Sequence, residues 1–237
     1  MILFLLTLLL DPVSIENEFL RLRVNPGPSE AGRFAVDTTG GNPASEKDDQ
    51  MRLVYGSTLP WSSFTLVRID GEDWVFGGPT TSPHEAGLGL RAGTPLSSPS
   101  PSEDGTTIST TFLLGSIKIE QSLGFVRGSS TGILDTVGIT YTATSMDDQE
   151  HRVGILMVLD TMLGSNDGAP LRAAEQEEGA QSEQCWEENP PPFWQAFDDL
   201  ENPTIMAQGT LETDGVGPNR FMFSNWGKLA KARWNES

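Results

Sequence analysis

The chain contains two histidines, which are the side chains best suited to proton transfer near neutral pH. His84 stands in a Ser-Pro-His-Glu segment, and three of the four residues before His151 are acidic. A histidine beside carboxylates can act as a general acid, but in loops such residues are more often structural. The sequence has no nucleophile elbow, phosphate-binding loop, dinucleotide fingerprint or zinc-protease motif. We therefore favour a protein that is not an enzyme, with His151 and His84 as the catalytic residues of the alternative.

A second group of chemically capable residues lies in the segment LDTMLGSNDGAP, from position 159 to 170. Asp160, Asn166 and Asp167 carry the hard oxygen atoms that Ca²⁺ prefers. Six positions separate Asp160 from Asn166, however, and the spacing of the helix-flanked calcium loop is absent. Asn-Asp-Gly is also ordinary turn chemistry. The segment predicts a turn, with a calcium site as the alternative, and we expect no other cofactor.

Tryptophan is frequent, with six residues in the chain. Trp194 and Trp226 are followed or preceded by amides and carboxylates, including Asp198. Sugar rings pack on flat aromatic faces while their hydroxyls bond to neighbouring polar groups. Trp194, Asp198 and Trp226 are therefore candidate carbohydrate-binding residues, against the alternative that they are core residues. We interpret Trp61 and Trp74 as core tryptophans.

The charge balance excludes several classes of partner. The 237 residues include 15 basic and 33 acidic side chains, which gives a net charge of −18. Nucleic acid and anionic membrane surfaces both require a cationic footprint, so neither is an expected partner. The single cysteine, Cys185, rules out an internal disulfide and lies in an acidic loop that disfavours its thiolate.

Hydrophobic periodicity predicts an all-β fold with few or no long helices. Apolar residues alternate with polar ones in the segments 20–24, 117–125 and 137–143, as in strands with one buried face. Asp70-Gly71 and Gly115-Ser116 each separate two such runs and predict tight hairpins. Many short strands joined by glycine-rich and proline-rich turns indicate an antiparallel β-sandwich.

Four segments without simple alternation complete the prediction. The segment 153–163 is apolar on both faces, and we expect a central strand buried on both sides. The best helical candidate is 192–200, of one or two turns. The Pro/Ser-rich segment 92–105 and the acidic segment 175–192 both predict surface loops.

The first residues, MILFLLTLLLDP, match the length of the apolar region of a secretory signal, although no basic residue precedes them. We interpret residues 1–12 as a signal or leader segment, with a first core strand as the alternative. Residues 13–237 are then expected to form a single β-sandwich domain. This pattern predicts a secreted, periplasmic or envelope location, with no membrane span in the mature chain.

Four strings in the chain are similar to one group of proteins. They are GRFAVDTTGGNP (32–43), HRVGILMVLDTMLGSNDGAPLR (151–172), PPFWQAFDDLENPTIMAQGTL (191–211) and NRFMFSNWGKL (219–229). They resemble uncharacterised bacterial envelope-associated proteins, and through these the galactose mutarotase-like superfamily. The resemblance implies a supersandwich that binds carbohydrate on an open sheet, and further strands after Trp234, so that the domain would be incomplete at its C-terminal end.

Two functions from different classes follow. The first is a non-catalytic binding or scaffolding module of the cell envelope, with a glycan or another envelope protein as partner. The second is a carbohydrate-active enzyme of the mutarotase-like type, an aldose epimerase or a lyase-like enzyme, and it rests on the resemblance alone. Neither histidine stands in an epimerase motif. The sequence therefore favours the binding module.

Overall fold

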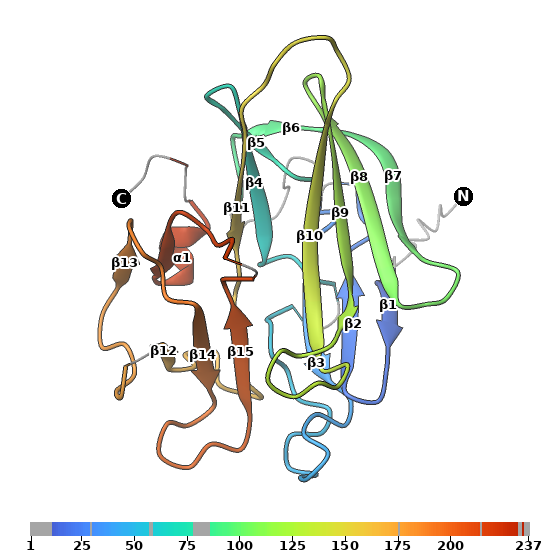
Figure 1. The fold of residues 1–237 in the computed structure, drawn as a ribbon. Coiled ribbons are helices and arrows are strands. Elements are labelled where there is room, and N and C mark those ends of the chain that lie inside the picture. The colour runs from blue at the N-terminus through green and yellow to red at the C-terminus, as the bar shows by residue number, and fades with distance from the viewer. Residues whose placement is uncertain are drawn as a thin grey trace, which may run out of the picture.

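The segments with period-two alternation form antiparallel strands in the computed structural model, which confirms the predicted all-β fold (Figure 1). The structure describes residues 11–28, 30–56, 59–77, 86–174, 176–213, 215–231 and 234. Within them the helical structure is one short turn, α1 (Trp226–Leu229). No helix among these residues is long and apolar enough to cross a membrane.

The longest sheet has the strand order β10-β9-β8-β7 and is antiparallel throughout. Its strands are β7 (Thr94–Pro101), β8 (Thr107–Leu114), β9 (Ile117–Val126) and β10 (Thr136–Ser145). Every second side chain of β8 is buried, as is every second side chain of the first two-thirds of β9, because one face of the sheet covers the core. The predicted hairpin at Gly115-Ser116 joins these two strands, and Gly115 has the positive φ of 59° that a tight turn requires.

Two smaller sheets face the long sheet. One contains β1 (Val13–Glu16), β2 (Leu20–Val24) and β3 (Phe34–Thr38) in that order. The other has the order β11-β4-β5-β6, with β4 (Phe64–Ile69), β5 (Glu72–Val75), β6 (Arg91–Ala92) and β11 (Val153–Val158). The predicted hairpin at Asp70-Gly71 joins β4 to β5, with φ values of 51° and 90°.

Apolar clusters hold these layers together as a sandwich. Leu22 and Phe34 of the first small sheet pack with Ile108 and Leu123 of the long sheet. Val67 and Ile69 of β4 pack in the same way with residues of β8 and β9. A buried polar bridge adds to this contact, because the Tyr141 hydroxyl on β10 lies 2.5 Å from Thr65 Oγ1 on β4 and accepts from Gln121 Nε2 on β9 at 2.8 Å.

The C-terminal third of the chain forms two further small sheets. They are β12-β14-β15, with β12 (Leu171–Ala173), β14 (Phe193–Phe197) and β15 (Met206–Thr210), and β13-β16, with β13 (Gln184–Trp186) and β16 (Phe221–Phe223). Their shared core contains Leu163, Trp194, Ile205 and Phe223. In Figure 1 this part lies beside the long sheet, with β15 facing the lower half of β10.

The segment 153–163 departs from its predicted position. It does form a strand, β11 (Val153–Val158), but among the described residues this strand is the edge of its sheet and pairs only with β4. Val153, Ile155 and Met157 are 36%, 39% and 38% exposed, so only the opposite face is covered. The prediction of a central strand buried on both sides was wrong, because apolar residues on the second face line a cleft rather than a core.

Three other segments also differ from the sequence expectation. The segment 92–105 contains an edge strand, β7, in which prolines are tolerated because no further strand requires their N–H groups. The segment 192–200 contains β14 instead of a helix, and the described part of the acidic segment, 176–192, is largely irregular but includes β13. On β10, Ala143 is exposed although alternation placed it inward with Val137 and Ile139.

Candidate functional site

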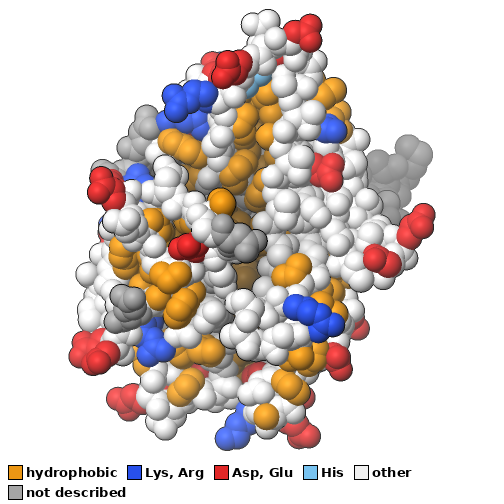
Figure 2. All heavy atoms as spheres, viewed as in Figure 1, with side chains coloured by type: hydrophobic (Ala, Val, Ile, Leu, Met, Phe, Trp, Pro, Cys, Tyr) orange, Lys and Arg blue, Asp and Glu red, His pale blue; other side chains and the backbone are white. Residues whose placement is uncertain are grey.

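A cleft of about 1210 Å³ opens between the long sheet and the C-terminal sheets. Figure 2 shows hydrophobic side chains gathered along the gap between β11 and β10 and around a hollow near the centre of this face. Ile139 and Tyr141 of β10 line it from one side, and Ile155 and Met157 of β11 line it from another. Both strands are sheet edges that are not bonded to each other, so the cleft is bordered by two strand edges that pair with no further strand in the described part of the chain.

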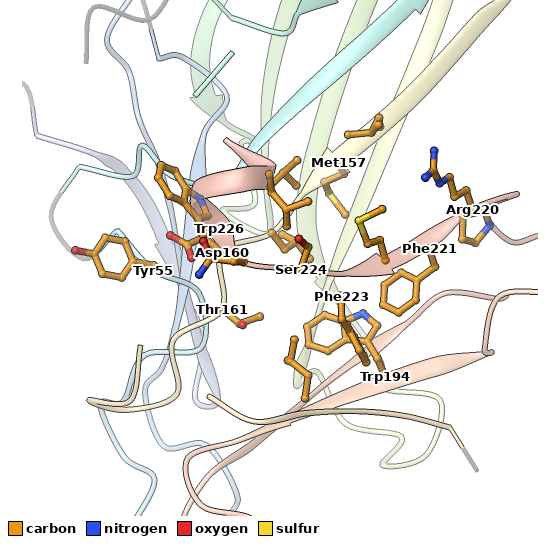
Figure 3. Close-up of a pocket in the computed structure, with 18 of the residues that line it drawn as sticks. Tyr55, Met157, Asp160, Thr161, Trp194, Arg220, Phe221, Phe223, Ser224 and Trp226 are labelled. Atoms are coloured by element: carbon orange, nitrogen blue, oxygen red, sulfur yellow. The ribbon is translucent and has the colours of Figure 1, made fainter. Parts of the chain in front are cut away.

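One end of the cleft is built from Tyr55, Trp61, Asp160 and Trp226, which we name the acidic aromatic corner. The Tyr55 and Trp61 rings meet edge to face at 5.7 Å and 87°, and the Trp61 and Trp226 rings do so at 5.3 Å and 83°. In Figure 3 the Asp160 carboxyl lies between Tyr55 and Trp226. The corner therefore has perpendicular aromatic walls and one carboxyl group.

Backbone contacts fix the residues of this corner. The Asp160 amide donates to Ser63 Oγ at 3.0 Å, and its carbonyl accepts from the Tyr55 amide at 2.7 Å. Asn225 caps the start of α1 by accepting from the Gly227 amide, which sets the position of Trp226. The Trp226 indole N–H then donates to the Ser62 carbonyl at 3.1 Å.

The electrostatics of Asp160 are unusual for a carboxyl group. Its pKa is raised from 3.8 to about 6, mainly by burial; interaction with the Ser62 hydroxyl opposes the shift, and the negative charge of Asp167 adds to it. Within the described residues, no lysine or arginine forms an ion pair with Asp160. The corner therefore holds a carboxyl group that lacks a cationic partner.

The opposite end of the cleft is apolar, with Trp194, Phe221 and Phe223 grouped together in Figure 3. Trp194 is 8% exposed and lies directly across the β14–β15 pair from Gly209. A Cβ atom at Gly209 would stand 2.2 Å from the indole nitrogen, so only glycine allows the ring to lie flat on β15. Trp194 thus serves the core and also contributes to the wall of the cleft.

The structure brings together some of the residues predicted from the sequence and separates others. Trp194, Trp226, Asp160 and Asp167 all line the cleft. Asp198 is not among the lining residues, because its carboxylate accepts from the amides of its own loop, at 2.9 and 3.1 Å.

Of the predicted calcium ligands, Asn166 and Asp167 stand in a turn, whereas Asp160 belongs to the acidic aromatic corner. Asn166 donates from its side chain to the Asp198 carbonyl at 2.8 Å and accepts from the Gly168 amide at 3.0 Å. Across the described residues there is no group of three or more His, Cys, Asp or Glu side chains that could hold a metal ion. These contacts account for the turn, and the calcium site stays a prediction.

His151 lies away from the cleft and connects three turns. Its Nδ1 is 2.6 Å from Asp70 Oδ2, its Nε2 is 2.9 Å from Asp147 Oδ1, and the Ser116 hydroxyl lies 3.4 Å from the same nitrogen. The hydrogen bonds to Asp70 and Asp147 raise the pKa of His151. The pKa of Asp70 is lowered by the Arg152 amide and then by His151, and that of Asp147 is lowered mainly by His151. His84 lies outside the described residues.

Sequence reasoning missed two of the four residues of the acidic aromatic corner. Trp61 was interpreted as a core residue, whereas it lines the cleft, and Tyr55 was not singled out. Both lie in an irregular stretch between β3 and β4, where no periodicity indicates which way a side chain points. The available signal was the density of aromatic residues between positions 55 and 64.

The fold and the cleft define a class, an all-β sandwich protein with an aromatic and acidic cleft. Comparison of the chain with protein-family models, with curated proteins and with solved structures finds no match. The resemblance to the mutarotase-like superfamily stays a prediction.

Proposed function

We propose that the protein is a non-catalytic binding or scaffolding module that holds a carbohydrate in this cleft. The observation that carries the proposal is that aromatic residues, among them Trp226, Tyr55 and Phe221, line one cleft together with polar groups. Sugar rings present C–H faces that pack on aromatic rings and hydroxyls that bond to carboxyl and amide groups. Asp160 and Asn225 supply such groups beside the rings.

The proposal is tested by screening the purified protein against a glycan array and measuring affinities by calorimetry. Trp226→Ala is expected to weaken binding at least tenfold, about 1.4 kcal/mol, by removing one wall of the acidic aromatic corner. Trp74→Ala is the matched control, because Trp74 lies on β5 and outside the cleft lining. Trp226→Phe keeps an aromatic face and separates loss of binding from loss of folding. Absence of binding to every glycan would overturn the carbohydrate proposal.

The second candidate, a carbohydrate-active enzyme of the mutarotase-like type, now has its best support in Asp160 rather than in His151. A carboxyl group with a pKa of about 6 in an aromatic cleft is suited to act as a general acid. Polarimetry on common aldoses tests this function. An equal rate of mutarotation for the native protein and Asp160→Asn would remove it.

We also propose a location in the cell envelope, which the apolar run at positions 1–10 supports. Fractionation of cells that express a C-terminally tagged chain tests the location. Recovery of the full-length tagged chain from the cytoplasm alone would contradict it.

A further inference from the structure

We propose that the acidic aromatic corner binds an organic ammonium group, with Asp160 as its counter-ion and Tyr55, Trp61 and Trp226 as its walls. This goes beyond carbohydrate binding, because it assigns a charged chemical group to one defined end of the cleft. The proposed carbohydrate site uses the same Trp226, Tyr55 and Asp160, so the two assignments are separated by comparing charged and neutral ligands.

The ring geometry is the first support. An ammonium group is attracted to the electron-rich face of tryptophan or tyrosine within about 6 Å of the ring centre. Two edge-to-face contacts in series, Tyr55–Trp61 and Trp61–Trp226, turn the three rings through successive right angles. All three rings line the cleft, and perpendicular rings can offer a cation more than one ring face at once. The hydrogen bond from Trp226 to Ser62 holds one wall in place before a ligand arrives.

The second support is how this chain treats its other aromatic faces. Arg68 lies over Trp234 at 5.4 Å, Arg91 over Trp74 at 5.6 Å, and Arg172 over Phe197 at 4.9 Å. Trp226 has no arginine of this kind among the described residues, although it stands beside a carboxyl group. Several aromatic faces therefore carry one of the chain's own cations, whereas no arginine covers the Trp226 ring in the part of the chain that the structure describes.

The charge of the cleft is the third support. Its charged lining residues are Asp160, Asp167 and Arg220, and Arg220 lies 3.7 Å from Glu187, so Asp160 is left without a cation. Burial penalises an ionised carboxyl group unless a cation or hydrogen-bond donors compensate it. A ligand with an ammonium group removes that penalty, whereas a neutral ligand of the same shape does not.

The test compares charged ligands with neutral counterparts. Calorimetry or NMR titration at pH 7 is made with choline and with its neutral isostere 3,3-dimethylbutan-1-ol. A second pair consists of a glucosamine oligomer and its N-acetylated form, in which the amine is neutral. We expect the charged member of at least one pair to bind about tenfold more tightly, the effect of a desolvated cation–π contact. The choline pair identifies a small ammonium ligand, and the sugar pair identifies an amine on a glycan.

Two variants separate the corner from the overall negative charge of the protein. Asp160→Asn is expected to abolish the preference for the charged ligand. Glu103→Gln makes the same change in charge at an exposed turn between β7 and β8 and is expected to leave it intact. Equal binding within both pairs, or a preference that persists in Asp160→Asn, would overturn the inference. Equal binding of the two sugar oligomers would still support the carbohydrate-binding function.

Discussion

Replacing Asp160 with asparagine is expected to stabilise the fold at neutral pH. The pKa of this carboxyl rises from 3.8 to about 6 on folding, mainly through burial. At pH 7 the folded chain therefore holds a half-buried carboxylate that the unfolded chain exposes to water. One pKa unit corresponds to about 1.4 kcal/mol, so the whole shift of the Asp160 pKa would represent a destabilisation of about 3 kcal/mol at pH 7. Because water reaches Asp160 through the cleft and screens its charge, we reduce the expected destabilisation to about 1.5 kcal/mol.

The sign of the effect defines the pH window. Because the folded-state pKa is raised, the stabilisation from the bound proton is fully present below pH 3.8 and is lost as the pH rises to about 6. Asparagine has no such proton. The stability of Asp160→Asn relative to the native protein should therefore increase by about 1.5 kcal/mol between pH 4 and pH 7.

Urea unfolding at several pH values, followed by tryptophan fluorescence at low protein concentration, measures this difference. Glu103→Gln serves as the control and should follow the pH dependence of the native protein, because Glu103 is exposed. Parallel stability curves for Asp160→Asn and the native protein between pH 4 and pH 7 would refute the reasoning. Such a result would mean that water or a neighbouring group already compensates the carboxylate.

Three further predictions concern packing, protonation and metal binding. Gly209→Ala should lower the free energy of unfolding by about 1–3 kcal/mol in urea denaturation, because the new methyl group overlaps the Trp194 indole. NMR titration should give His151 a pKa above 6.5, and Asp147→Asn should lower that pKa. The stabilisation of the fold by the proton on His151 is fully present below pH 6.5 and is lost as the pH rises through the folded-state pKa of His151. A calcium site would raise the melting temperature of chelated protein on addition of Ca²⁺, and Asp167→Ala would reduce that rise.

Each of these three has a distinct contrary outcome. Gly168→Ala is the control for packing, since its nearest neighbour, Asn166 Oδ1, would stand 3.6 Å from the new Cβ atom. Equal losses of stability in the two glycine variants would contradict the overlap. A titration of His151 at or below 6.5 would show that the carboxylates do not hold its proton. An unchanged melting temperature in millimolar Ca²⁺ would leave the turn as the whole account of segment 159–170.

Local periodicity was sufficient to predict the sheets but not their contacts. The alternation in β8 and β9 is imposed by one buried and one open face, so each strand carries its own signal. The stretch that became β14 carries no such signal, because five residues after a proline run fit a helical turn as well as a strand. Its pairing with β12 and β15 and the packing of Trp194 decide the matter, and these are contacts between distant positions.

The candidate site was only partly predictable for the same reason. Trp194, Trp226 and Asp160 were visible from residue type, and the cleft does unite them. Tyr55 and Trp61 come from an irregular connection more than 90 residues away from Asp160, and the hydrogen bond between the Tyr55 amide and the Asp160 carbonyl joins the two segments. The apolar second face of β11 was visible too, but a face that lines a cleft has the same composition as one that fills a core.

The unpaired edges of β10 and β11 make the colloidal stability of this protein depend on its solvent. Open strand edges are templates for pairing between molecules. The net charge of −18 keeps copies of the chain apart at neutral pH. Protonation of carboxylates at about pH 4 removes that repulsion, and concentrated salt screens it. Under either condition an intact fold with its edges still open is expected to self-associate, so precipitation would report loss of repulsion rather than unfolding.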